Sequence, residues 1–445
     1  MYNCEKEFNK FYRHKVVLSE KNQNNLRDKR KKNIKRLRDG LEEYNKENNT
    51  EFKLSENRIQ GSMAMHTIIQ NEKKDYDIDV GVVFEKEQFI DFGPFKTRKI
   101  IAEALSKKTA QFSEDPEVKT SCVRLKYSSG YHIDFAIFRR YKENEDDDKY
   151  IYDHAGAEWT IRDLKGVEEW FADEIKEKGT NLRKVVRLCK KFCNSKSNMP
   201  SGLIQTILCA EEFDSSHDRI DEIFYYTMAN ILNRLKTDII VNAPVDNNRP
   251  LVYRKKDEQR MESFKNQLQT NIDKLSVLFE SYCTKNEAMN IWKDFFDDSY
   301  WSEFTDDSLE CSSRKFDDTE QFIDDMYPIN ERYNLSIACE IETKGFMKKS
   351  LESYLTFIKS RCIKRDLSIK CYIKSTNCKS YDKILWKVRN VGIEAEKRND
   401  IRGQISNRGE YIIENSKFNG EHYVECYLIK DGVCVAIGHI DIPIE

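Results

Sequence analysis

Two short stretches of the chain alternate apolar and polar residues with a period of two. In residues 77–84, Asp77 and Asp79 occupy alternate positions, and so would point to the same face. In residues 131–138, Asp134 alternates with the apolar residues Ile133 and Phe135. Alternation of this kind is typical of a β-strand with one face buried. The remaining parity of the first stretch is wholly apolar, consisting of Ile78, Val80, Val82 and Phe84. We therefore predict two strands that each direct carboxylates to one face.

Carboxylates spaced in this way suit metal-assisted phosphoryl chemistry. Residues i and i+2 of a strand lie roughly 6.5–7 Å apart at Cα, so their side chains can converge on two divalent cations about 3.5–4 Å apart. A neighbouring strand that carries Asp134 would supply a third hard oxygen ligand, as Mg²⁺ prefers. The pattern predicts Asp77, Asp79 and Asp134 as catalytic metal ligands. The expected cofactor is a pair of Mg²⁺ ions, with Mn²⁺ as the alternative.

Gly61 and Ser62 precede residues 63–70, a run that is compatible with a helix. Glycine lets the backbone come close to phosphate, and a helix start offers free N–H groups with a positive dipole end. Together with the carboxylates, this turn predicts a site for a nucleoside triphosphate and two metal ions.

The rest of the chain divides by its periodicity. Helical spacing predicts a long helix over residues 16–48, another over 96–107, and a helical block from about 161 to 298. Further strands are expected near 57–60 and 121–127. After residue 328 the chain alternates again between glycine-containing turns, as an all-β module requires. The segments expected to form this module are 335–341, 367–374, 384–390, 411–414, 422–429 and 434–444.

Composition narrows the function classes. With 75 Lys and Arg against 77 Asp and Glu, the net charge is −2, which argues against a surface built for nucleic acid. No apolar run approaches 18 residues, and the amino-terminal residues contain no apolar signal region, so we expect a cytoplasmic protein without a membrane partner. The 13 cysteines contain no Cys-x-x-Cys motif, and we expect reduced thiols.

Several segments resemble those of a known enzyme family. They are Gln60–Thr67, Tyr76–Phe84, Tyr131–Asp134, Leu182–Phe192 and Pro200–Leu203. In these segments the chain resembles the DNA-polymerase-β-like nucleotidyltransferases, and within them the bacterial CD-NTases of the SMODS class. These are relatives of animal cyclic GMP-AMP synthase and oligoadenylate synthase that make signalling oligonucleotides in CBASS anti-phage operons.

The resemblance implies a function and further site residues. It implies that nucleoside triphosphates, ATP or GTP foremost, are joined into a cyclic di- or trinucleotide with release of pyrophosphate, and that the product activates an effector in defence. It places Gln60, Gly61, Ser62, Lys190 and Ser201 beside the nucleotide, with Lys191 competing for the role of Lys190. Two alternatives stay open: a nucleotidyltransferase that modifies RNA or a protein, and a catalytically silent nucleotide sensor.

The last block resembles the AGS-C sensor domain that is often fused to SMODS nucleotidyltransferases. The matching stretches are Trp386–Gly392, Arg402–Ile405 and Gly420–Tyr427. A regulatory ligand or protein is expected here: Trp386 would stack on a base while Arg389 or Arg402 holds phosphate. The competing interpretation packs Trp386 in the β core.

One basic run needs a separate interpretation. Residues 27–32, continued to Arg38, could contact nucleic acid, as the corresponding helix does in animal relatives, or form the solvated face of the long helix.

We therefore expect an α+β protein with four parts. A polymerase-β-like nucleotidyltransferase core on a long spine helix occupies residues 1–160, and a helical-bundle lobe that completes the active-site cleft occupies 161–305. A linker over 306–325 leads to an all-β sensor-like domain over 326–445.

Overall fold

The computed structural model describes residues 1–71, 76–112, 114–127, 130–305, 320–342 and 347–445. The chain forms two units, which are described separately: unit 1 comprises residues 1–174 and 182–301, and unit 2 comprises 175–181 and 302–445. Most of the predicted linker, including Asp306–Ser308 and Asp317–Asp318, lies outside the described residues. Among the described residues, no helix combines the length and the apolar character needed to cross a bilayer.

Unit 1 is built on one mixed sheet with the order β1-β2-β5-β4-β3, extended by β6 and β7 beside β5. Strands β2 and β5 run parallel, and the other neighbours are antiparallel. The strands are β1 (Glu56–Gln60), β2 (Asp77–Glu85), β3 (Glu117–Val118), β4 (Val123–Lys126), β5 (His132–Tyr141), β6 (Ile151–Ala155) and β7 (Trp159–Ile161). The four strands expected in this part of the sequence are all present, as β1, β2, β4 and β5. The α+β class is confirmed.

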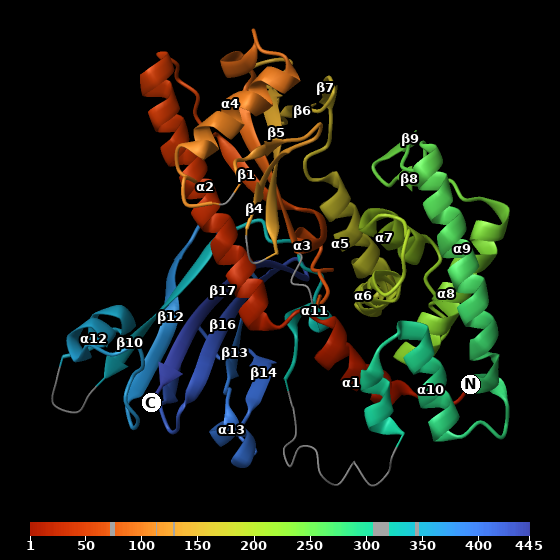
Figure 1. Ribbon diagram of the computed structural model, residues 1–445. Helices are drawn as coiled ribbons and strands as arrows, with labels where there is room; N and C mark the ends of the chain where they lie inside the picture. The colour runs from red at the N-terminus through yellow and green to blue at the C-terminus, as the bar shows by residue number, and fades with distance from the viewer. Residues whose placement is uncertain (72–75, 113, 128–129, 306–319, 343–346) are drawn as a thin grey trace. The chain divides into compact units, whose positions relative to one another are not determined.

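Two helices cover one face of this sheet, α2 (Glu20–Asn48) and α4 (Pro94–Ser106), which lie side by side in Figure 1. Their buried residues form one core with the apolar side chains on one face of β2 and β5. The core includes Leu37, Leu41, Ile78, Val80, Val82, Ile100, Leu105, Ile133 and Phe135. At Gly40 the two helices approach so closely that an added Cβ would overlap the carbonyl oxygen of Ala104. The opposite face of the sheet is thereby left for the carboxylates.

Two helices are shorter than the sequence pattern predicts. The long helix begins at Glu20 rather than at residue 16, and the run over 63–70 is helical only in α3 (Gly61–Ala64). The reason is tertiary: Val17 and Ile69 form an antiparallel bridge, and the amide of Gln70 donates to the carbonyl of Val16 at 2.8 Å. Pairing between these two segments replaces the helical hydrogen bonds that each would otherwise make.

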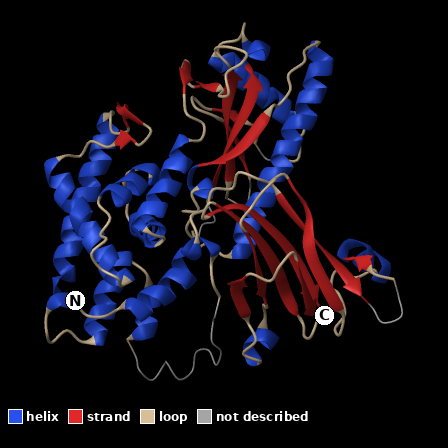
Figure 2. Cartoon of the chain, turned by 180° about the vertical axis from the view of Figure 1, so that it is seen from behind, coloured by secondary structure: helices blue, strands red, loops and turns tan. Residues whose placement is uncertain are grey.

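The second part of unit 1 is largely helical (Figure 2). Its helices are α5 (Gly166–Lys178), α6 (Asn181–Asn194), α7 (Gly202–Glu211), α8 (Ile220–Thr237), α9 (Lys255–Leu275) and α10 (Lys285–Phe296). A hairpin of β8 (Asn242–Ala243) and β9 (Asp246–Pro250) interrupts them. Helix α1 (Glu5–Phe11) joins this part, with the ring of Phe8 edge-on to Trp292 at 4.6 Å. Unit 1 also contains the short helical turns η1 (Tyr12–Val16), η2 (Lys86–Phe89) and η3 (Ser276–Phe279), and η4 (Ser299–Phe304) crosses its boundary with unit 2.

Unit 2 consists of two four-stranded antiparallel sheets with the orders β11-β10-β12-β15 and β14-β13-β16-β17. Their facing side chains form one shared core. The strands are β10 (Leu335–Glu342), β11 (Lys349–Ser350), β12 (Ser368–Thr376), β13 (Lys383–Arg389), β14 (Arg402–Ser406), β15 (Tyr411–Asn415), β16 (Gly420–Lys430) and β17 (Val433–Ile444). Three short helices depart from the all-β expectation, namely α11 (Ile323–Met326), α12 (Leu351–Ile358) and α13 (Ile393–Lys397).

Of the two interpretations of Trp386, packing in the β core agrees with the structure, and the expectation of reduced thiols is wrong for two cysteines. Trp386 is fully buried, and its Nε1 donates to the carbonyl of Gly409 at 2.8 Å, so the indole cannot stack on a ligand. Cys339 and Cys371, which are direct partners across β10 and β12, form a disulfide rather than two thiols. The alternating pattern correctly placed Trp386, Cys339 and Cys371 in strands. It did not predict that all three are buried between the two sheets, where the indole packs and the cysteines pair.

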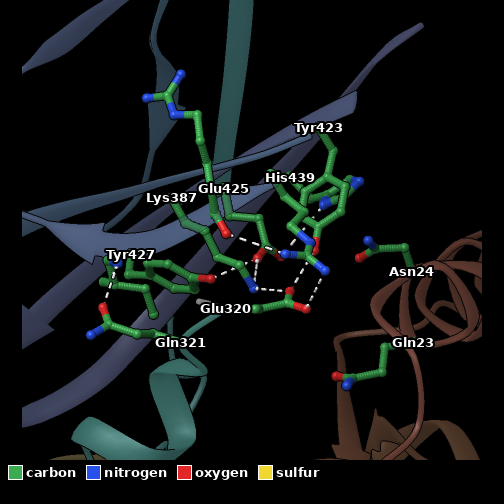
Figure 3. A network of polar contacts seen from close by, with 12 residues as sticks. Gln23, Asn24, Glu320, Gln321, Lys387, Tyr423, Glu425, Tyr427 and His439 are labelled. Atoms are coloured by element: carbon green, nitrogen blue, oxygen red, sulfur yellow. Dashed lines mark hydrogen bonds and ion pairs between the residues drawn. The ribbon is translucent and has the colours of Figure 1, made fainter. Parts of the chain in front are cut away.

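A buried polar network holds Glu320, which precedes the strands of unit 2, against the β13–β16 pair (Figure 3). The ammonium of Lys387 lies 2.7 Å from an oxygen of Glu320 and 3.4 Å from an oxygen of Glu425. The hydroxyl groups of Tyr423 and Tyr427 donate to these carboxylates at 2.9 and 2.7 Å. A buried charge is tolerated only when it is paired, so Glu320 is an integral part of this domain.

The close contact at Gly40 leads to a stability prediction in which helix propensity and steric overlap oppose one another. Alanine has a higher helix propensity than glycine by about 1 kcal/mol, yet its methyl group would overlap the Ala104 carbonyl. We expect Gly40→Ala to lower the free energy of unfolding by about 1–3 kcal/mol, the range for overpacking. Chemical denaturation is the measurement, with Lys32→Ala on the exposed face of α2 as control. A stabilised Gly40→Ala protein would show that the helices can separate freely.

Candidate active site

The predicted carboxylates lie together on the open face of the β2–β5 pair. The parallel register sets Asp77 opposite His132 and Asp79 opposite Asp134. Because side chains alternate along a strand, all four side chains start from the same face of the sheet. The opposite parity is buried under α2 and α4, which fixes this orientation.

Two basic residues accompany the carboxylates. Arg124 on β4 is the register partner of Asp134, and its guanidinium donates to both oxygens of that carboxylate at 2.7 and 2.6 Å. It also lies 3.5 Å from Asp77, whose carboxylate contacts the ring of His132. Bidentate pairing of this kind is a strong charge-assisted interaction. Arg124 therefore offsets part of the negative charge in this structure.

Asp79 is the most strongly perturbed of the carboxylates. Burial, followed by repulsion from Asp77 and Asp134, raises the pKa of Asp79 to about 7. Gly61 lies directly against this carboxylate, since a Cβ at Gly61 would overlap its Oδ2. Gly61 also adopts φ +63°, which favours glycine. The predicted Gly-Ser turn and the carboxylates are thus adjacent.

The donor set fits a divalent cation. One oxygen of Asp77, one oxygen of Asp134 and a ring nitrogen of His132 all lie within 4.8 Å of one another. Carboxylate oxygens suit Mg²⁺ and Mn²⁺, and imidazole is a common ligand of transition metals. Asp79 does not belong to this group of three; burial first, and then repulsion from Asp77 and Asp134, raises its pKa.

A cavity of about 660 Å³ opens beside the carboxylates. Among the predicted residues, Gln60, Gly61, Ser62 and Lys190 line it together with the three aspartates. Ser201 is not among the lining residues, although its neighbours Gly202 and Leu203 are. The hydroxyl of Ser201 instead accepts from the amide of Ile204 and caps α7.

Lys190 and Lys191 point to different surroundings. Lys190 lines the cavity and its ammonium donates to the Thr67 hydroxyl at 2.7 Å. Burial lowers the pKa of Lys190 to about 8, which leaves the ammonium mostly charged at neutral pH. Lys191 forms an ion pair with Asp298 at 2.8 Å instead. Of the two lysines, Lys190 is therefore the one that lines the cavity.

Sequence reasoning did not select three residues at this site, Arg124, His132 and Glu168. His132 shares the parity of Asp134, so the strand pattern contained the signal. Arg124 becomes visible only once the register of β4 and β5 is known. Glu168 on α5 accepts a hydrogen bond from the Gly61 amide at 3.0 Å, and no local pattern indicates a contact over 107 residues.

The basic run on α2 makes contacts within unit 1. Lys29 lies over the ring of Tyr131 at 3.3 Å, and Arg36 donates to the Tyr127 hydroxyl at 2.9 Å. Lys31 and Lys32 remain exposed. Part of this run therefore anchors α2 to the sheet, as expected of a spine helix.

Comparisons with known proteins agree with this geometry. Residues 55–138 match the family model of the cyclic GMP-AMP synthase DncV-like nucleotidyltransferase domain. Residues 317–445 match that of the adenylyl/guanylyl and SMODS C-terminal sensor domain. An Escherichia albertii protein named cyclic GMP-AMP synthase is 25% identical over 406 residues, 87% of this chain and 84% of the relative. The resemblance to nucleotidyltransferases with a C-terminal sensor domain is confirmed.

Solved structures show the same fold. The Vibrio cholerae DncV cyclic AMP-GMP synthase in complex with the linear intermediate pppA(3′,5′)pG has a TM-score of 0.55 at 19% identity, covering 69% of this chain and 99% of that chain. The V. cholerae dinucleotide cyclase DncV in complex with GTP and 5MTHFGLU2 has a TM-score of 0.56 at 18% identity, covering 69% and 98%.

The raised pKa of Asp79 predicts how stability depends on pH in metal-free protein. A carboxyl whose pKa is higher in the folded state stabilises the fold below its unfolded pKa of about 4, and this contribution is lost as the pH rises through about 7. We expect Asp79→Asn to raise the melting temperature at pH 8 and to flatten its decline between pH 5 and pH 8. Thermal melts in a chelator are the measurement. An unchanged pH profile would mean that Asp79 is ionised without penalty.

Proposed function

We propose that this chain, which combines a DncV-like nucleotidyltransferase domain with an AGS-type C-terminal sensor domain, joins ATP and GTP into a cyclic dinucleotide and releases pyrophosphate. The observation that carries the proposal is the face of Asp77, Asp79 and Asp134 beside a cavity lined by Gly61, Ser62 and Lys190. The relative from E. albertii bears the name of this activity. The product would activate an effector in anti-phage defence.

In this proposal each residue has a defined part. Lys190 and the Ser62 hydroxyl bind oxygens of the triphosphate, and Gly61 allows the backbone to approach it. Asp134 accepts the proton of the attacking ribose hydroxyl at a carboxylate oxygen. For this, Arg124 must release the carboxylate that it holds here. A second transfer between the ends of the linear product closes the ring.

Asp77, Asp79 and Asp134 would hold the divalent metal, with Mg²⁺ proposed as the natural ion and two ions as the number. When bound, the metal offsets negative charge on the triphosphate and the leaving pyrophosphate. The protein contributes a fixed carboxylate geometry, because β2 and β5 are held in register between buried apolar residues.

The alternatives differ in the acceptor. An RNA-tailing or protein-modifying nucleotidyltransferase would keep the same carboxylates, and a silent sensor would use them only for binding. Neither is favoured, since the relatives found are named as cyclic GMP-AMP synthases.

Product analysis tests the proposal. We expect purified protein with labelled ATP, GTP and Mg²⁺ to form a phosphatase-resistant product, and Asp77→Asn combined with Asp79→Asn to abolish it while the protein stays folded. Thin-layer chromatography and circular dichroism are the measurements. Lys32→Ala serves as a control for exposed charge. Label retained on RNA or protein would support the modifying alternative, and full activity of the folded double variant would contradict the site.

We propose further that the C-terminal domain binds a regulatory, nucleotide-like ligand in a cavity of about 290 Å³ between its two sheets. Arg402 lines this cavity, adopts φ +59° and pairs with Glu414 at 2.7 and 3.1 Å. A non-glycine residue held in this region is often found at functional sites. His422 also lines it, and burial lowers the pKa of His422, which keeps the ring neutral.

The cavity is linked to the buried network of unit 2. Tyr423 lines the cavity and donates to Glu320, and Arg389 donates to the carbonyl of Arg402 and lies 3.4 Å from Glu320. A ligand can regulate only if it binds one state more tightly than the other. Glu320 is the first residue that the structure describes after residue 305, and a ligand that changes its contacts with Tyr423 and Arg389 could favour one state over the other.

This sensor role predicts a selective effect of cavity variants. We expect Arg402→Gln and His422→Ala to make the same product in vitro but to change, by severalfold, the ratio of product before and after phage infection of cells. Mass spectrometry of cell extracts is the measurement, with Lys364→Gln as exposed control. Wild-type ratios in both variants would refute the cavity as the sensor site.

A further inference from the structure

Glu168 makes a contact that neither the triad nor the phosphate contacts explain. It lies in the first turn of α5, and its Oε1 accepts from the backbone amide of Gly61 at 3.0 Å. Both residues line the 660 Å³ cavity. The turn that is proposed to face the triphosphate is therefore held from the opposite lobe by a carboxylate.

A second bond joins the same two segments. The side-chain amide of Gln60 donates to the carbonyl of Leu164 at 3.3 Å, and Leu164 is buried against β2. Asp163 fixes the start of α5 by accepting from the amides of Lys165 and Gly166, both at 2.9 Å. The segment that carries Glu168 is thus built to a defined position against Gln60 and Gly61.

The charge of Glu168 is poorly compensated where it lies. Burial raises the pKa of Glu168 to about 7, although the amide of Gly61 and the charge of Arg58 on β1 lower it. Asp163 before α5 raises it as well, and Glu168 in turn raises the pKa of Asp79 on β2, while the wall of the same cavity also carries the basic residues Arg162 and Lys190. A triphosphate entering beside Gly61 would add further negative charge.

We propose that Glu168 is a positioning residue that holds the Gly61-Ser62 turn on the cavity wall and takes up a proton from solvent when the triphosphate binds. The inference rests on the proposed function. A neutral carboxylic acid keeps a carbonyl oxygen that accepts from the Gly61 amide, so the turn stays in place. Protonation of Glu168 also removes the repulsion that its carboxylate would exert on the nearby phosphates.

A purely structural role makes a different prediction. If Glu168 served only to join α5 to the sheet, its removal would lower stability and leave the pH dependence of binding unchanged. Glu168→Gln separates the two roles, because its amide oxygen can accept from Gly61 but its charge never changes.

The experiment is isothermal titration of the full chain with a non-hydrolysable ATP analogue and Mg²⁺ between pH 6 and pH 8. For uptake of one proton by a group that titrates near pH 7, linkage gives a dissociation constant about tenfold higher at pH 8 than at pH 6. Because the phosphates also titrate in this range, wild type is compared with Glu168→Gln. Asp173→Asn, exposed on the same helix, is the matched control.

We expect the dissociation constant of wild type and of Asp173→Asn to rise about tenfold more between pH 6 and pH 8 than that of Glu168→Gln. At pH 8, Glu168→Gln should bind the analogue more tightly than wild type. Glu168→Ala should bind weakly at every pH and raise KM more than it lowers kcat. An identical pH profile in wild type and Glu168→Gln, or wild-type affinity in Glu168→Ala, would overturn the proposal. Wild-type protein that binds the analogue but makes no cyclic product would contradict the proposed function alone.

Discussion

Mutual repulsion between Asp77, Asp79 and Asp134 is the constraint around which unit 1 is arranged. Three carboxylates on one face of two adjacent strands destabilise a fold unless something else fixes the strands. Here the apolar parity of β2 and β5 packs under α2 and α4, and Arg124 and His132 contact the carboxylates from the open face. The apolar core under α2 and α4 therefore holds the three carboxylates close together, although their mutual repulsion opposes this arrangement.

The parts of this arrangement that follow from local pattern were predictable. Period-two alternation gave β2 and β5 and the shared face of Asp77 and Asp79, since a strand allows no other placement. The match of Asp79 with Asp134 needed the parallel register, which alternation does not specify. Arg124 and Glu168 needed tertiary contacts across the sheet and between lobes. The helix expected after Ser62 failed because Ile69 pairs with Val17, a competition that no single window of sequence contains.

The C-terminal domain shows the limit of reasoning from residue types alone. Trp386 and Arg389 have side chains suited to a nucleotide, yet the indole is buried and the guanidinium of Arg389 pairs with Glu320. Charged and aromatic residues in a small β module also serve its own folding, because a two-sheet core leaves polar groups that must be paired. Residue type alone cannot tell whether such a side chain binds a ligand or stabilises the domain. The contacts of each side chain in the structure distinguish the two roles.

The network around Lys387 has a practical consequence for how this domain can be isolated. Lys387 and Glu425 are almost wholly buried, and Glu320 supplies the nearest oxygen to the lysine. A recombinant fragment that starts at residue 326, where alternation resumes, would lack Glu320 and also Gln321, which accepts from the Ile405 amide at 2.8 Å. In its interior Lys387 would keep only the more distant carboxylate of Glu425, and a buried ammonium that loses its nearer partner destabilises the fold. A fragment that begins at residue 317, where the match to the sensor family starts, retains both residues.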